Sequence, residues 1–415
     1  MLAGFGQAEW TPPLGTELAG YGYYLARKAE WVDDPLFVRA AAFSEAGETC
    51  LLICCDCLGL DIKLTDRVKD SLKKEYGIPR DNVMIVSIHT HTGPAIKHHF
   101  GCGNVNPDYV ESVPDKIMEA CRAAILDLSS VNSLSFIQNP LTRPCAFNRA
   151  FAENPVDDQA RFFKIQRIGK KPMLLASYAC HPVCRGVSRG VSADYPGAIC
   201  KKLNEKGYDA IYLNGLCGDI NPIRDLQDKA ALIQRFADTV LAAMKGNENP
   251  LPLCFSCGTV EDRLCMEKMT REEISAIVHQ ANERETEPPG GGRVAKEWAE
   301  ELLAREFPLP NEETFHAHYL VLGGVPIVSL PFEGFTLTGM LIRKALKDNR
   351  ALVLGCQEEM LGYLPTMDDY DRHSYAARDA FFLYRRVPTL RGEAERIGQD
   401  VGKKLAQRLG EGAKA

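Results

Sequence analysis

Short apolar segments alternate with amphipathic segments along most of the chain, and this alternation predicts the fold class. A short apolar run bounded by turn residues indicates a buried strand, whereas apolar residues three or four positions apart indicate a helix. Strands are expected at 49–55, 83–88, 134–137, 161–168, 173–178, 210–213, 316–322, 325–330 and 351–355. Helices are expected at 65–76, 109–126, 195–205, 226–245 and 337–347, with a surface helix at 393–409. This order predicts an α/β fold in which helices cover central sheet.

A polar, helical stretch at 270–305 departs from this alternation. It is interrupted by Pro288-Pro289-Gly290-Gly291-Gly292, and both residue types break regular structure, so this segment is the best candidate for a mobile loop. The length of 415 residues allows two or three domains or one large α/β unit, and we expect a helical insertion or lid at 265–312.

Composition and charge narrow the range of partners. The 415 residues carry a net charge of −6 with scattered basic residues, which argues against nucleic acid as a partner. No apolar run reaches the ~18 residues of a membrane helix, so no stable membrane insertion is expected. We expect no signal peptide and a cytoplasmic location. In the cytoplasm, the fifteen cysteines are expected to be free thiols. Cys254 and Cys257 form a single CxxC pair, which is more typical of ordinary strand residues than of a second metal or redox site.

Polar clusters follow several of the expected strands directly. The clusters are His89-Thr90-His91-Thr92-Gly93-Pro94, His181-Pro182, Gly218-Asp219-Ile220-Asn221-Pro222 and Pro331-Phe332-Glu333. In α/β sheets, ligands bind outside the carboxyl ends of the strands. We therefore expect these clusters to converge on one crevice.

Histidine and carboxylate side chains in these clusters predict a metal site. Zinc in catalytic sites prefers histidine nitrogen and carboxylate oxygen, with one position left open. The chain has only nine histidines, and His89, His91 and His181 all follow apolar strands. The alternative for the His-Thr-His segment is a pair of hydrogen-bonded loop histidines. His98 and His99 fit either the mouth of the site or a solvated loop.

The order of these motifs resembles the catalytic domain of the neutral, non-lysosomal ceramidases. Singly the motifs are weak, but in this order they are specific and span almost the whole chain. They are Asp34-Pro35-Leu36, Ala40-Ala41-Ala42, Asp56, His89-Thr90-His91-Thr92-Gly93-Pro94, Asn148-Arg149, His181-Pro182, Gly218-Asp219-x-Asn221-Pro222, Pro331-x-Glu333, Tyr363-x-x-Thr366 and Tyr375. The resemblance implies central mixed β-sheets flanked by helices, in one catalytic domain spanning 1–415 that carries the insertion or lid.

The resemblance also implies one zinc ion per chain and a role for each site residue. The implied zinc ligands are His89, His181, Glu333 and Tyr363. From residue type alone, Tyr363 fits a core aromatic at a strand end, and a His/Glu/Tyr set would also hold iron or manganese. The implied catalytic groups are His91, beside the metal or stabilising the oxyanion, Arg149 on the substrate carbonyl or its anion, and Tyr375 as a hydrogen-bond donor at the reaction centre.

The chain departs from the ceramidase pattern at Asn221, where that family has a serine proposed as nucleophile. Asparagine cannot act as a nucleophile of this kind, so we expect metal-activated water instead, with Asp219 or His91 as general base. The amide of Asn221 would donate to the oxyanion. We also expect no C-terminal immunoglobulin-like domain.

The predicted function is therefore a zinc-dependent amidohydrolase that cleaves a C–N amide bond, or an ester, in a small-molecule or acyl-amide substrate. Two alternatives stay open. One is a ceramidase-like hydrolase of lipid N-acyl groups, and the other is a catalytically silent metal-binding scaffold or sensor.

Overall fold

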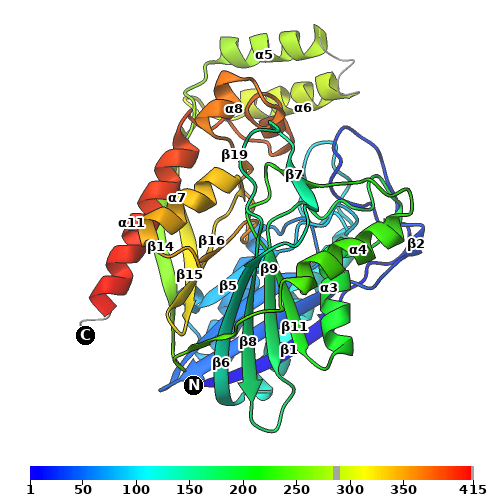
Figure 1. The fold of residues 1–415 in the computed structure, drawn as a ribbon. Helices are drawn as coiled ribbons and strands as arrows, with labels where there is room; N and C mark the ends of the chain where they lie inside the picture. Colours follow the sequence, from blue (N-terminus) through cyan, green and yellow to red (C-terminus); the bar gives the residue numbers. More distant parts are fainter. Residues whose placement is uncertain (284–289, 413–415) are drawn as a thin grey trace.

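The computed structural model describes residues 1–283 and 290–412 (Figure 1). Its largest sheet is made of β1 (Leu2–Glu9), β3 (Phe37–Glu45), β4 (Glu48–Cys55), β5 (Val83–Ser87), β6 (Ser129–Pro140), β8 (Gln159–Arg167), β9 (Met173–Tyr178), β11 (Asp209–Asn214) and β13 (Asn249–Leu251). The strand order is β11-β9-β8-β6-β1-β3-β4-β5, with β13 pairing with β6. The pairs β4–β5 and β9–β11 are parallel, and the other pairs are antiparallel. The expected mixed sheet is confirmed.

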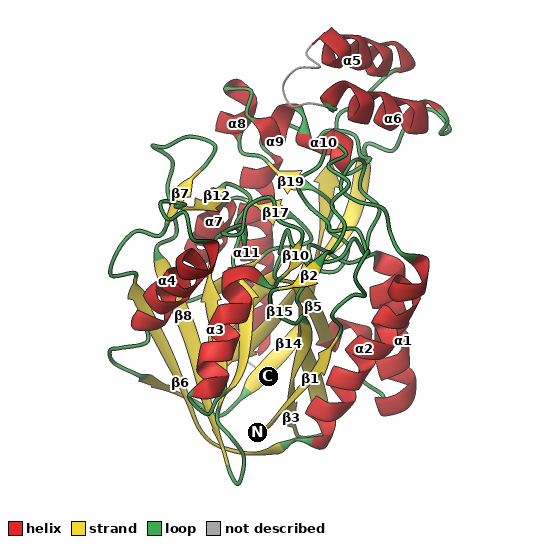
Figure 2. Ribbon diagram, turned by 90° about the vertical axis from the view of Figure 1, so that its right-hand side faces the viewer, coloured by secondary structure: helices red, strands yellow, loops and turns green. Residues whose placement is uncertain are grey.

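This sheet bends, so that its two ends face each other across one core. β11 contacts β3, β4 and β5, and the thiol of Cys54 donates to the carbonyl oxygen of Tyr212 at 3.0 Å. Helices α1 (Ile62–Tyr76) and α2 (Pro107–Leu126) lie on one side, with the 3-10 turn η1 (Arg80–Asn82) leading into β5. Helices α3 (Asp194–Glu205) and α4 (Lys229–Ala242) lie on the other side (Figure 2).

Two long strands of this sheet, β1 and β3, have no counterpart among the expected elements. In β1, Gly4 and Gly6 take the places of larger apolar residues because α2 packs directly on the strand. A Cβ on Gly4 would lie 2.1 Å from the carbonyl oxygen of Ala124, and a Cβ on Gly6 would lie 2.1 Å from that of Ala120. β3 contains the run Ala40-Ala41-Ala42, which is buried on both faces and therefore lacks strand alternation.

A second, smaller sheet has the order β14-β15-β16-β18. Its strands are β14 (Phe255–Cys265), β15 (Glu312–Leu322), β16 (Val325–Ser329) and β18 (Leu352–Leu354), and helices α7 (Thr336–Leu346) and α11 (Glu393–Gly412) pack beside it. Ala394, Ile397, Val401 and Leu405 form a buried stripe along α11, and their helical spacing explains why this helix could be predicted.

Two helices connect β14 to β15, within the segment expected to be an insertion or lid. They are α5 (Arg271–Glu283) and α6 (Gly291–Leu303), and they lie at one end of the molecule (Figure 1). Gly291 and Gly292 begin α6, whereas Pro288 and Pro289 of the predicted loop lie outside the described residues. Trp298 of α6 is fully buried against the aromatic rings of α10 (Ala380–Leu383). A role of the segment containing α5 and α6 as a lid stays a prediction.

Three short strand pairs near the site complete the fold. They are β2 (Trp31–Val32) with β10 (Gly190–Val191), β7 (Ala146–Asn148) with β12 (Ile220–Pro222), and β17 (Glu333–Gly334) with β19 (Tyr363–Leu364). The turns α8 (Met367–Asp371) and α9 (Tyr375–Arg378) follow β19. Among the described helices, none combines the length and the apolar character that crossing a bilayer requires.

Candidate active site

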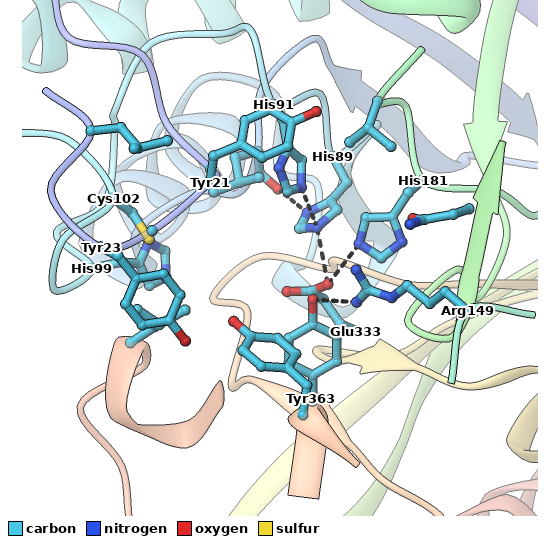
Figure 3. A pocket seen from close by; sticks show the side chains of 18 of the residues that line it. Tyr21, Tyr23, His89, His91, His99, Cys102, Arg149, His181, Glu333 and Tyr363 are labelled. Carbon is cyan, nitrogen blue, oxygen red and sulfur yellow. Dashed lines mark hydrogen bonds and ion pairs between the residues drawn. The ribbon is translucent and has the colours of Figure 1, made fainter. Parts of the chain in front are cut away.

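A cavity of about 430 Å³ lies beyond the carboxyl ends of β5 and β9. It brings together most of the residues that the sequence predicted for the site (Figure 3). The predicted residues that line it are His89, His91, Arg149, His181, Asn221, Glu333, Tyr363 and Tyr375. Asp219 is the predicted residue that does not line it.

His89 follows β5 and is held in a strained backbone conformation. Its φ is +69°, in the left-handed region that side chains other than glycine rarely adopt. Its main-chain N–H donates to the carbonyl oxygen of Cys57 at 2.9 Å, and its Nδ1 lies 2.8 Å from the carbonyl oxygen of Leu58. These two contacts fix the imidazole so that its Nε2 points into the cavity.

In the segment that follows β5, the threonines anchor the backbone and the histidines face the cavity. The hydroxyls of Thr90 and Thr92 both donate to the carbonyl oxygen of Ser192, at 2.8 and 2.9 Å, and so anchor the segment to the neighbouring loop. The histidines face the cavity, with Nε2 of His91 lying 3.4 Å from Nε2 of His89. Gly20 packs against His91, where a Cβ would lie 2.5 Å from Nδ1.

His181 follows β9 and is oriented in the same way as His89. Its Nδ1 lies 2.5 Å from the carbonyl oxygen of Cys217 and 3.1 Å from that of Ile220. Its Nε2 lies 3.1 Å from Oε2 of Glu333. The side chain is completely buried, so its direction is set by the fold rather than by solvent.

Glu333 lies at the centre of the cluster, on the short strand β17. This strand pairs in parallel with β19, and the register places Glu333 opposite Tyr363. Oε2 lies 3.1 Å from Nε2 of both His89 and His181, and Oε1 accepts a hydrogen bond from the hydroxyl of Tyr384. The carboxylate is only 2% exposed, so water does not solvate it.

The protonation of this cluster follows from its partners. A carbonyl oxygen can only accept, so Nδ1 of His89 and of His181 each carry a proton, and their Nε2 atoms face Glu333. Burial, together with the charge of Arg149, lowers the pKa of His181 to about 4, so this ring is neutral at pH 7. The unprotonated Nε2 of His181 then faces a carboxylate oxygen at 3.1 Å, with no proton between them.

These donors suit a divalent cation. Two imidazole nitrogens and a carboxylate are the ligand types that catalytic zinc sites use, and an Nδ1–H bonded to a carbonyl is the usual support of a metal-binding histidine. The candidate nitrogens of His89, His91 and His181 all lie within 4.8 Å of one another. Nδ1 of His91 is buried and has no hydrogen-bond partner among the described residues, so His91 lacks the support that the other two have.

Comparison with known proteins bears on the fold. No protein-family model matches the chain, and no curated protein matches it. Among solved structures, the neutral ceramidase from Pseudomonas aeruginosa is similar with a TM-score of 0.76 and 15% identity, over 98% of this chain and 74% of that chain. The chain has a neutral ceramidase-like fold. A ceramidase complexed with C2 is similar with the same TM-score and identity, over 98% of this chain and 75% of that chain.

Within this ceramidase-like fold, Arg149 and Tyr363 lie beside the carboxylate. Nε and Nη2 of Arg149 donate to the carbonyl oxygen of Gly218 at 3.0 and 2.8 Å, and Nη2 also donates to the Tyr363 hydroxyl at 2.7 Å. The ring of Tyr375 lies at the cavity wall, 6.1 Å from that of Tyr363. Asn221 lines the cavity, and its Oδ1 is buried without a partner among the described residues.

Asp219, which the sequence placed at the reaction centre, lies elsewhere. Its Oδ1 accepts from the main-chain N–H and the hydroxyl of Thr336, at 3.0 and 3.1 Å, and its Oδ2 accepts from the amide of Asn148 at 2.8 Å. The carboxylate therefore joins β7 to the start of α7. Its place after a strand resembles that of the other polar clusters, but the side chain points away from the cavity. It supports the site through its own carbonyl oxygen, which accepts from the N–H of Arg149 at 2.7 Å.

Several aromatic residues of the cavity were missing from the sequence prediction. Tyr384 is the most important, because its hydroxyl donates to Glu333 from a position 51 residues further along the chain. It follows the short helix α10, where no periodic pattern marks it. Tyr21 and Tyr23 come from an N-terminal loop, in which both have positive φ.

The two histidines that the sequence left open, at the mouth of the site or in a solvated loop, lie in different places. His99 lines the cavity, whereas His98 lines a neighbouring cleft.

Proposed function

We propose that this protein is a zinc-dependent amidohydrolase that cleaves the C–N bond of an N-acyl amide. The observation that carries the proposal is the convergence of His89, His181 and Glu333 on one point. Each histidine is supported by a carbonyl oxygen, and no proton separates Nε2 of His181 from the carboxylate. Such a set of buried acceptors is costly unless a cation lies among them.

Tyr363 completes the proposed ligand set. It lies opposite Glu333 in the β17–β19 pair, and its hydroxyl accepts a hydrogen bond from Arg149, whose positive charge favours an electron-rich phenol oxygen. His91 is the other candidate, but its Nδ1 has no acceptor among the described residues to hold the ring as a ligand. The two differ in a measurable way, because loss of a ligand lowers metal affinity whereas loss of a neighbouring group lowers kcat.

A zinc ion in this position would polarise the scissile carbonyl and lower the pKa of a water molecule. The protein supplies the remaining functions. Arg149 is held by its bonds to Gly218 and Tyr363, with Nη1 free of partners among the described residues to meet the carbonyl oxygen of the substrate. The amide of Asn221 can donate to the same oxygen as charge develops.

His91 is the proposed acceptor of the proton, since Asp219 lies outside the cavity. Burial, followed by the neighbouring His89 and His181, lowers the pKa of His91 well below its usual value. The ring is therefore neutral at pH 7 and has a nitrogen able to take a proton. Tyr375 lies at the wall, from which its hydroxyl can donate to the amine that leaves.

The apolar part of the cavity suits an acyl group. Leu58 and Leu383 line it together with several tyrosines, and a volume of about 430 Å³ lies in the range of small-molecule sites. Ceramidases share this fold, so a lipid N-acyl amide is one substrate class to test. A silent metal-binding scaffold would keep the metal but cleave none of the substrates.

The test combines metal analysis with an activity screen. Purified protein should contain about one zinc ion per chain and hydrolyse N-acyl amides or esters, and a chelator should abolish the activity. His181→Ala should lose both metal and activity, whereas the matched variant His98→Ala should keep both, because His98 is exposed and lies outside the cavity. Activity that survives complete removal of the metal would overturn the proposal.

A further inference from the structure

The charges that line the active-site cavity do not balance. Glu333 is its one carboxylate, and Arg149 and Arg224 are its two guanidinium groups. Because the whole chain carries a net charge of −6, an excess of positive charge in this cavity goes against the overall balance.

Neither arginine has a carboxylate partner. No ion pair within 4.0 Å involves Arg149 or Arg224 in the part of the chain that the structure describes. Arg149 lies at the reaction centre, where Gly218 and Tyr363 hold it. Arg224 makes no hydrogen bond to any described residue, and its exposed side chain can therefore meet a ligand.

Arg224 and Asn221 come from the same short segment at the wall of the cavity. Asn221 lies in β12, in register with Phe147 of β7, and Arg224 follows two residues after the end of that strand. Nη1 of Arg224 lies 3.5 Å from where a Cβ on Gly186 would be, so the side chain reaches the loop that also contributes Val183. A guanidinium that is free to donate suits a planar carboxylate.

The opposite wall has a different character. Figure 3 shows Tyr23, Cys102 and His99 on one side of the Glu333 carboxylate, with His181 and Arg149 on the other. The side with Tyr23 also includes Leu383, which packs against Gly22. An N-acyl substrate whose carbonyl meets Arg149 would therefore place its acyl chain against the aromatic wall and its amine part near Arg224.

We infer that the preferred substrate is an N-acyl amino acid, whose carboxylate binds Arg224. This inference rests on the proposed amidohydrolase function and deepens it by naming the amine part. Arg224 is then a residue that determines specificity, whereas Arg149 acts at the scissile carbonyl.

The test compares three amides with the zinc-loaded protein. They are N-dodecanoylglycine, the neutral N-dodecanoylglycinamide, and a glycinamide whose acyl chain carries a terminal carboxylate. We expect kcat/KM for N-dodecanoylglycine to exceed that of either other amide by about tenfold or more, since a charge-assisted hydrogen bond to the substrate is lost in each. Arg224→Gln should remove this preference and leave the rate with the glycinamide within about threefold.

A matched control separates specific binding from general attraction. Arg189 lies in the loop beside Arg224, is exposed, pairs with Glu30 and does not line the cavity. Arg189→Gln removes the same charge from the same region and should leave the preference unchanged. If both variants reduce it equally, or if the glycinamide or the terminal carboxylate is preferred, the inference is wrong although the amidohydrolase function stands.

A binding measurement keeps the test independent of turnover. The ketone isostere of N-dodecanoylglycine, in which CH2 replaces the amide N–H, cannot be cleaved. Calorimetry should show its affinity for Arg224→Gln reduced by about tenfold or more relative to the unchanged protein and to Arg189→Gln. If no amide is cleaved, the proposed function fails but this comparison still decides the carboxylate site, and equal affinities would overturn it.

Discussion

Glu333→Gln should have opposite effects on stability with and without metal. In the metal-free protein at pH 7, Oε2 of Glu333 faces the bare Nε2 of His181 at 3.1 Å. A glutamine amide would donate to this nitrogen and still accept from Tyr384. Satisfying this buried acceptor gives a gain of roughly 1 kcal/mol in the free energy of unfolding.

With zinc present the sign reverses. A ligand bound to the folded state at a hundred times its dissociation constant stabilises by about 2.7 kcal/mol. Loss of the charged ligand should raise that constant by about 100-fold or more, which removes most of this stabilisation. The variant should therefore be more stable than the parent in chelator and less stable in zinc.

Urea unfolding at pH 7, in chelator and in zinc, measures both effects. Glu359→Gln is the matched control, because Glu359 pairs with Lys97 at 2.8 Å outside the active-site cavity. This control should lose a little stability equally in both conditions. If Glu333→Gln destabilises the metal-free protein as much as the zinc-loaded one, His181 is not the bare acceptor that the cluster requires.

Three other changes probe the surroundings of the cluster. Gly20→Ala should lower the free energy of unfolding by more than the ~1 kcal/mol of strain expected for the control Gly15→Ala, and it should also lower kcat. A Cβ on Gly20 would clash with His91, whereas a Cβ on Gly15 would meet nothing within 4 Å. Tyr384→Phe removes the hydroxyl bound to the metal-binding carboxylate and should weaken zinc affinity by about 10-fold to 100-fold, measured by competition with a chelator. Burial raises the pKa of Asp219 to about 6. Protonation of Asp219 therefore contributes its full stabilisation of the folded state below about pH 4, and this stabilisation is lost as the pH rises through 6. The stability difference between the parent and Asp219→Ala should therefore shrink from pH 4 to pH 7 in urea unfolding, and a constant or growing difference would contradict the assignment.

The sequence could predict much of the site because its polar clusters follow strands whose apolar pattern is clear. His89 and His181 come after β5 and β9, and both strands were expected within a residue of their ends. Glu333 follows β16 in the same way. The same rule failed for Asp219, because position after a strand does not determine the direction of a side chain when a helix N–H competes for it.

Other parts of the fold and site had no local signal. Tyr384 reaches the cluster only through the packing of α10 on α6 and α9, which sequence periodicity does not describe. The glycines of β1 and the alanine run of β3 removed the alternation that marks a strand, since their roles are close packing against α2 and burial on both faces. No pattern in the sequence singles out Arg224, because its proposed role depends on which residues line the cavity.

The most direct test of the metal centre is a crystal structure of the zinc-loaded protein with anomalous data at the zinc edge. We expect one strong peak per chain, about 2.0–2.2 Å from Nε2 of His89, Nε2 of His181 and an oxygen of Glu333. The oxygen of Tyr363 should complete the set. An ordered crystal with no peak at this point, or with zinc bound only at other residues, would contradict the central claim.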